Sequence, residues 1–138
     1  MNNIFTIGYG SNKPQDFLAR LKDAGITHVL DVRRANSKSW CGSYVPGPAM
    51  NKTIHDANIE YREWPGLGNK YDTLDAYRDC FLTSKDGNGL ISYLAEMVRR
   101  QYRDKVCILC SERHAYRGGK VNCHRVYVAE KLVEELRE

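Results

Sequence analysis

The stretch from Val106 to Tyr127 (VCILCSERHAYRGGKVNCHRVY) constrains the fold of this chain more than any other part of it. Its apolar start predicts a β-strand. A polar cluster and a Gly-Gly loop follow, and the chain then resumes as a helix that opens with Cys-His-Arg. The segment from Cys110 to Arg125 holds two cysteines, one acid, two histidines and three arginines. We therefore expect any chemistry to lie there.

The composition is that of an ordinary globular protein. The chain has 138 residues, of which 42% are apolar and 28% are charged, so we predict one domain spanning residues 1–138. The net charge of +4 is compatible with an anionic partner without requiring one. A mildly positive solvated face would give the same excess.

The first residues, MNNIFTIGYGS, lack the basic and apolar regions of a secretory signal. No apolar run approaches the roughly 18 to 20 residues that span a bilayer. The five cysteines form no disulfide-scaffold spacing, so we predict reduced thiols. These observations together predict a soluble, cytoplasmic protein with no membrane partner.

The N-terminal part of the chain predicts a strand, a helix and a second strand. The run Ile4–Ile7 is rich in β-formers, and Ser11 or Asn12 can cap a helix that begins at Pro14 and stops at Gly25. The second strand is His28–Arg33. Such a unit is right-handed with parallel strands, and its loops lie at the carboxyl ends of the strands, where ligands bind in α/β sheets.

The remaining elements alternate in the same way. The sequence predicts a surface loop over Ala35–Pro48, a short helix over Met50–Ala57, a strand over Ile59–Trp64, a helix through Leu74 and Leu82 that is broken by Ser84–Gly89, a helix over Leu90–Tyr102, a strand over Lys105–Cys110 and a final helix from Asn122 or Cys123. This order predicts a three-layer α/β domain with a small, mainly parallel sheet flanked by helices.

Three predicted loops then converge at the carboxyl edge of the sheet. We expect catalytic side chains at Cys110, Glu112, Cys123 and His124, and ligand-binding residues at Gly8, Tyr9, Ser11, Asn12, Asp31, Arg33 and Arg125. A thiol at a helix N-terminus beside His and Arg favours the reactive thiolate. The same helix start can bind a phosphate or sulfate, with Arg125 or Arg33 as its bidentate partner.

Each of these residues also has a structural interpretation. Cys110 can be a small buried residue at a strand end, and Asp31 with Arg33 can be a buried ion pair that ties two loops together. The loop Arg113–Lys120 (RHAYRGGK) mixes basic and aromatic residues as phosphate-binding loops do, but a solvated, mobile loop reads the same way.

A metal site is the less favoured alternative. Cys107 lies three positions before Cys110 and should point to the opposite face, which argues against a zinc knuckle formed by these two residues. A mixed site of Cys110, His114, Cys123 and His124 would need adjacent Cys-His ligands, a poor chelating arrangement, and the chain has no second C-x-x-C. We therefore predict no metal and no cofactor.

An ordered set of motifs resembles a known family. The segments TIGYGSN (Thr6–Asn12), DVR (Asp31–Arg33), Leu67-Gly68, LCSE (Leu109–Glu112) and CHR (Cys123–Arg125) are similar to domain of unknown function number 488, the YeaO-like bacterial proteins. The resemblance implies a compact bacterial, archaeal or phage α/β domain and the same site positions, but no reaction. Many members have His where this chain has Tyr9.

A fainter likeness links the chain to rhodanese-type and phosphatase-type domains, but no Cys-x5-Arg loop follows Cys110. Three functions remain open. The first is an enzyme that acts on a nucleotide-like or other anionic small molecule, with Cys110 or Cys123 as nucleophile, or with Glu112 and Asp31 as acid and base. The second is a non-catalytic module that binds nucleotide or nucleic-acid phosphates in DNA or RNA processing or defence. The third is a purely structural polar network.

Overall fold

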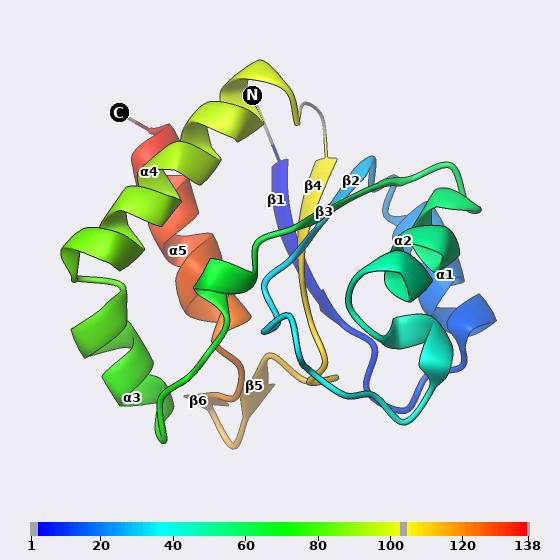
Figure 1. Cartoon of the computed structure of the whole chain (residues 1–138), viewed down its shortest axis with the longest axis horizontal. Helices are drawn as coiled ribbons and strands as arrows, with labels where there is room; N and C mark the ends of the chain where they lie inside the picture. The colour runs from blue at the N-terminus through cyan, green and yellow to red at the C-terminus, as the bar shows by residue number, and fades with distance from the viewer. Residues whose placement is uncertain (1–2, 103–104, 138) are drawn as a thin grey trace.

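Four parallel strands form the centre of the molecule (Figure 1). The computed structural model describes residues 3–102 and 105–137. The strands are β1 (Asn3–Gly8), β2 (His28–Asp31), β3 (Glu60–Glu63) and β4 (Lys105–Cys110). Their order in the sheet is β1-β4-β2-β3, and every pairing is parallel. The most apolar strand, β4, lies between β1 and β2. A strand that is buried on both faces of a sheet typically has a continuous apolar sequence.

Helices cover both faces of the sheet, as Figure 1 shows. Helices α1 (Pro14–Asp23) and α2 (Pro48–His55) pack on one face through a core that includes Phe17, Met50 and Leu109. Helices α4 (Lys85–Arg100) and α5 (Arg125–Leu136) pack on the other through a core that includes Leu94 and Ile108. The predicted three-layer α/β domain is therefore confirmed.

Shorter elements complete the chain. They are 3₁₀ turns at Gly42–Tyr44 and Pro65–Leu67, helix α3 (Leu74–Ala76) continued by a π-helical turn at Tyr77–Phe81, and the strands β5 (Tyr116–Arg117) and β6 (Lys120–Val121). In residues 3–102 and 105–137, no helix combines the length and the apolar character needed to cross a membrane.

The predicted cap of α1 is wrong. Lys13 is the N-cap residue and makes no side-chain cap hydrogen bond. The Asn12 side chain instead accepts a hydrogen bond from Arg20, a residue within α1, at 2.7 Å. It therefore contacts the side of the helix rather than its N-terminus. The second strand is also shorter than predicted, and β2 ends at Asp31 rather than at Arg33.

The predicted break between the two helices is confirmed, but it is shorter than Ser84–Gly89, because α4 already begins at Lys85. Ser84 is the N-cap of α4, since its hydroxyl accepts from the amide of Gly87 at 3.1 Å. A Cβ on Gly87 would lie 2.1 Å from the carbonyl oxygen of Phe81. The glycine therefore permits close approach of the helix start to the preceding turn, and the helix runs on through it.

The predicted loop between Glu112 and Cys123 contains a small antiparallel hairpin, β5–β6. Gly118 and Gly119 connect its strands with φ values of 58° and 76°, the backbone conformation that a two-residue hairpin turn requires. The final helix starts at Arg125, later than predicted, because the hairpin and a bend at Cys123 occupy the intervening residues.

Candidate active site

The predicted site divides between the two faces of the sheet. Gly8 pairs with Cys110, and Asp31 pairs with Leu109. Side chains at neighbouring register positions share a face, and successive side chains alternate. Asp31 therefore lies with Leu109 on the α1–α2 side, whereas Cys110 lies on the α4–α5 side. Cys107 packs in the α1–α2 core, which confirms that it points away from Cys110.

On the α4–α5 side, Cys110, Cys123 and His124 form a cluster that we call the Cys–His cluster. The Nδ1 atom of His124 lies 3.8 Å from Sγ of Cys110 and 3.9 Å from Sγ of Cys123. All three potential ligand atoms lie within 4.8 Å of one another, and all three residues are buried. The carboxyl end of β4 and the start of α5 thus bring together three of the four predicted catalytic residues.

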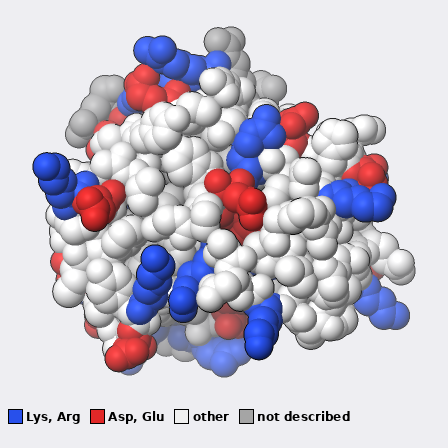
Figure 2. All heavy atoms as spheres, viewed as in Figure 1, with Lys and Arg blue, Asp and Glu red and all other residues white. Residues whose placement is uncertain are grey.

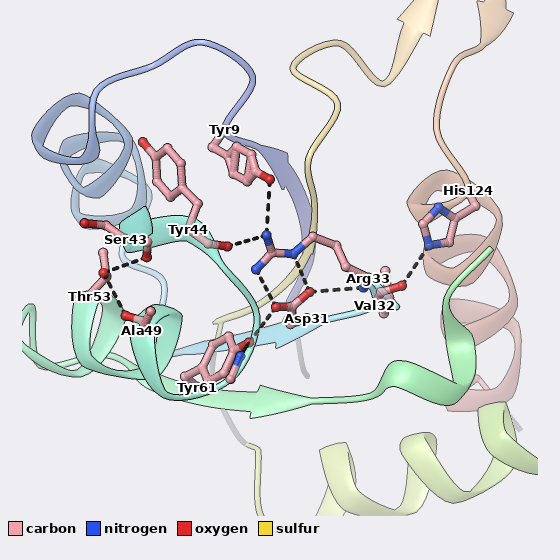
Figure 3. A network of polar contacts seen from close by, with 11 residues as sticks. Tyr9, Asp31, Val32, Arg33, Ser43, Tyr44, Ala49, Thr53, Tyr61 and His124 are labelled. Atoms are coloured by element: carbon pink, nitrogen blue, oxygen red, sulfur yellow. Dashed lines mark hydrogen bonds and ion pairs between the residues drawn. The ribbon is translucent and has the colours of Figure 1, made fainter. Parts of the chain in front are cut away.

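The ring of His124 is held in one orientation. Its Nε2 lies 2.9 Å from the carbonyl oxygen of Val32, just beyond β2 (Figure 3). A carbonyl can only accept, so Nε2 carries the proton and, in the neutral ring, Nδ1 presents its lone pair to the two sulfurs. The ring of Tyr77 packs edge-on against the imidazole at 5.0 Å, and the Tyr77 hydroxyl donates to the carbonyl of Leu67 at 2.5 Å.

The cluster favours the thiolate of Cys110. A hydrogen bond from Cys123 lowers the pKa of Cys110 well below its usual value, although burial opposes the shift; His124 and the amide of Glu112 also lower it. The contact with Cys110, together with burial, raises the pKa of Cys123. Burial lowers the pKa of His124, but the contact with Cys110 outweighs it, and the net shift is upward. By contrast, burial raises the pKa of Cys107 to about 12.

Arg125 follows the cluster in sequence and is 2% exposed. Its NH1 donates to the carbonyl of Glu112 at 2.5 Å and its NH2 to that of Arg113 at 3.5 Å. No salt bridge of Arg125 exists within residues 3–102 and 105–137, and its Nε has no hydrogen-bond partner there. Gly8 leaves room for this arrangement, since a Cβ there would lie 1.5 Å from the Glu112 carbonyl oxygen.

Arg33, unlike Arg125, forms a salt bridge with a carboxylate. On the α1–α2 face its guanidinium donates to both carboxylate oxygens of Asp31, at 2.9 and 2.7 Å, to the Tyr9 hydroxyl at 3.2 Å and to the Tyr44 carbonyl (Figure 3). Tyr61 donates to the same carboxylate at 2.5 Å. Burial lowers the pKa of Arg33, but the bond to Asp31 outweighs it and the net shift is upward. This geometry matches the structural interpretation of Asp31 and Arg33.

The other predicted ligand-binding residues take part in packing at the first loop. Tyr9 is buried and stacks on Tyr44 with ring centroids 4.1 Å apart. Asn12 accepts from Arg20 through its side chain and from the Tyr44 hydroxyl through its carbonyl, both at 2.7 Å. Ser11 is exposed at the surface. Glu112 is partly exposed on the loop after β4. It is the fourth predicted catalytic residue and is not part of the Cys–His cluster.

The Cys–His cluster is also the group of residues that could hold a metal. It contains three of the four side chains considered for zinc; the fourth, His114, is exposed. The objection to adjacent Cys-His ligands does not hold here. A bend at Cys123 and a turn at His124 precede α5, and this irregular backbone lets both side chains point to one place.

A cavity of about 440 Å³ lies elsewhere, between β1, the hairpin and α5. Its polar lining includes Glu130, Glu134 and Arg137, and two carboxylates disfavour an anionic occupant.

Sequence reasoning missed the partners that fix the site, chiefly Tyr77 and the Val32 carbonyl. A backbone carbonyl has no sequence signal, and Val32 lies within the predicted strand His28–Arg33, whereas β2 ends at Asp31.

The fold and the cluster define an α/β protein with a buried thiol–imidazole centre at the carboxyl edge of a parallel sheet. The family model for the domain of unknown function DUF488 matches residues 13–132, which is most of the chain. The protein therefore belongs to the DUF488 family, as its motifs predict. The chain matches no curated protein and no solved structure.

Proposed function

We propose that the protein is an enzyme that acts on a nucleotide-like or other anionic small molecule, with the Cys–His cluster as its reactive centre. The observation that carries this proposal is the convergence of two thiols and an oriented imidazole beside Arg125. Perturbed titratable groups gathered at one edge of a sheet are typical of catalytic sites. Glu112, partly exposed on the loop that leaves β4, is the proton carrier of this proposal.

Arg125 supports an anionic substrate. A buried guanidinium without a carboxylate is costly, and an anion is the partner that compensates it. Arg125 also lies in the first turn of α5, where the helix dipole favours negative charge. Arg33, whose donors already have partners within the protein, has no part in this proposal.

The surface around the centre is basic. Figure 2 shows Lys and Arg side chains along the lower part of the view, where Figure 1 places the β5–β6 hairpin. Arg113, Arg117 and Lys120 on this segment are all exposed. Such a surface raises the local concentration of anionic substrates.

The test is substrate consumption. The wild-type protein, purified without chelator, is incubated with nucleoside mono-, di- and triphosphates and with sugar phosphates, and phosphorus NMR follows each compound. We expect at least one compound to be converted by the wild type and by Cys80→Ser, whose thiol is exposed and outside the cluster. Cys110→Ser should reduce the rate at least about 100-fold, the order expected for loss of a catalytic group. Conversion of no compound, or full activity of Cys110→Ser, would overturn the proposal.

A second candidate function is binding of nucleic-acid phosphates without turnover. It is favoured by aromatic side chains exposed near the same basic residues, since Trp40 is 61% and Tyr116 is 57% exposed. Trp40 is fixed near this edge because its Nε1 donates to the carbonyl of Gly10 at 2.6 Å. Basic residues with exposed rings are a general means of binding single strands.

The second function predicts salt-dependent binding of a fluorescein-labelled single-stranded oligonucleotide, followed by anisotropy. Replacing Arg113, Arg117 and Lys120 by Gln should reduce the slope of log K against log salt by about two if three phosphate contacts are lost. Replacing the exposed Lys22, Lys52 and Lys85 by Gln removes the same charge elsewhere and should leave the slope nearly unchanged. Equal slopes for the two triple variants would count against this function, and Cys110→Ser should bind as the wild type does.

A further inference from the structure

We infer that the Cys–His cluster is a zinc site, with Cys110, Cys123 and His124 as its three protein ligands. Two thiolates and an imidazole are the donor set that selects zinc among the common divalent ions. The zinc site uses the same three residues as the proposed function, but it requires metal binding only and no turnover. It also assigns the two sulfurs a role as ligands rather than as nucleophiles.

The separations suit a tetrahedral ion. With zinc–sulfur and zinc–nitrogen bonds of about 2.3 and 2.0–2.1 Å, the sulfur and nitrogen ligands of a tetrahedral site lie about 3.6 Å apart. The two observed sulfur–nitrogen distances are 3.8 and 3.9 Å. The sulfurs themselves lie within 4.8 Å of each other. The observed sulfur–nitrogen distances are thus within a few tenths of an ångström of the tetrahedral value.

The surroundings of the three ligands point to a metal independently. Metal-binding histidines usually donate the other ring N–H to a carbonyl or carboxylate, which fixes the coordinating nitrogen. The Val32 carbonyl accepts that bond from His124 at 2.9 Å and leaves Nδ1 for the ion. The sulfurs are supported as well, since the amide of Glu112 bonds to Cys110 and that of Arg125 to Cys123. Such bonds stabilise thiolates, the form that binds metals.

The charges favour an anion in the fourth position. Zinc with two thiolates and a neutral imidazole has no net charge, and the thiol protons leave to solvent on binding. The guanidinium of Arg125, the residue that follows His124, contacts carbonyl groups rather than a carboxylate. Three protein ligands with one open position is the arrangement of catalytic zinc sites. In this arrangement the fourth ligand is water or an anionic group of the substrate.

The test is metal binding to the full chain, without an activity measurement. The protein is stripped with a chelator, and Zn²⁺ is titrated in competition with a chromophoric chelator. We expect one ion per chain. Co²⁺ in place of Zn²⁺ should give a thiolate-to-cobalt charge-transfer band together with the intense visible bands of tetrahedral cobalt.

Variants locate the site. Cys110→Ser, Cys123→Ser and His124→Gln should each lower the affinity for Zn²⁺ by more than about 100-fold, beyond the 10–100-fold cost of losing an outer partner. His114→Gln and Cys80→Ser are the matched controls, because both side chains are exposed and outside the cluster, and they should bind as the wild type does. Circular dichroism identifies any variant that fails to fold, and the Co²⁺ spectrum of the wild type then decides.

Absence of the thiolate-to-cobalt band in the wild type, or wild-type affinity for Zn²⁺ in a folded Cys123→Ser variant, would overturn the zinc site. The result is separable from the proposed function. Conversion of a phosphorylated compound by a protein that binds no zinc leaves the enzyme and removes the metal. Zinc binding without conversion of any compound leaves the metal and removes the enzyme.

Discussion

At the scale of single residues, Arg33 and Arg125 show how two arginines with the same predicted role can differ. Both are almost fully buried. Arg33 is neutralised by Asp31 through a bidentate contact, whereas the contacts of Arg125 within the described residues are to carbonyl groups. Since only a guanidinium without a counter-ion gains by binding an anion, the sequence motif alone does not distinguish the two roles, and the neighbours do.

The Asp31–Arg33 pair leads to a prediction about stability. Asp31→Asn removes the counter-ion and leaves Arg33 buried, so it should lower the free energy of unfolding by about 3–5 kcal/mol, measured by urea denaturation. Asp56→Asn is the control, because the Lys52–Asp56 pair is exposed at 78% and 62%, and it should leave the free energy of unfolding nearly unchanged.

A double variant distinguishes an uncompensated charge from lost packing. Asp31→Leu with Arg33→Met replaces both charges by apolar side chains, which is often neutral for a buried pair, so it should be more stable than Asp31→Asn. If the two variants are equally unstable, packing rather than charge accounts for the loss.

At the scale of elements, much of the fold was predictable from the sequence. All four strands of the sheet and the helices between them follow from apolar periodicity, because parallel strands buried on both faces read as apolar runs. The break between the two helices was predicted to extend through Gly89, because glycine counts as a helix breaker in isolation, whereas α4 begins at Lys85. Only the close contact of Gly87 with Phe81 shows why the helix contains it.

The site was predicted in part. The meeting of Cys110 with Cys123 and His124 followed from placing a strand end beside a helix start. The separation of Asp31 from Cys110 was missed, although the alternation of side chains along strands decides it once the register Asp31–Leu109 is known. The register between strands that are distant in the chain cannot be derived from a single sequence. The orientation of His124 was not predictable, since its partner is a backbone carbonyl.

At the scale of the whole molecule, the DVR and CHR motifs meet across the sheet at Val32. On one face the Asp31 carboxylate accepts from the backbone amide and side chain of Arg33, at 3.0 and 2.9 Å. This ring of contacts fixes the turn that contains Val32. On the other face the Val32 carbonyl holds His124. We therefore expect the buried ion pair to help position the imidazole on the opposite face.

This coupling predicts that Asp31→Leu with Arg33→Met weakens zinc binding, although neither residue lies on the side of the cluster. Loss of an outer partner of a metal-binding histidine typically costs 10–100-fold in affinity, so we expect a decrease of at least about tenfold in the competition titration. Tyr61→Phe removes one hydrogen bond to Asp31 but keeps the ion pair, and should bind zinc within about threefold of the wild type, well below that range. A folded double variant with wild-type affinity would show that the two faces act independently, because the Val32 carbonyl would then keep its place without the ion pair.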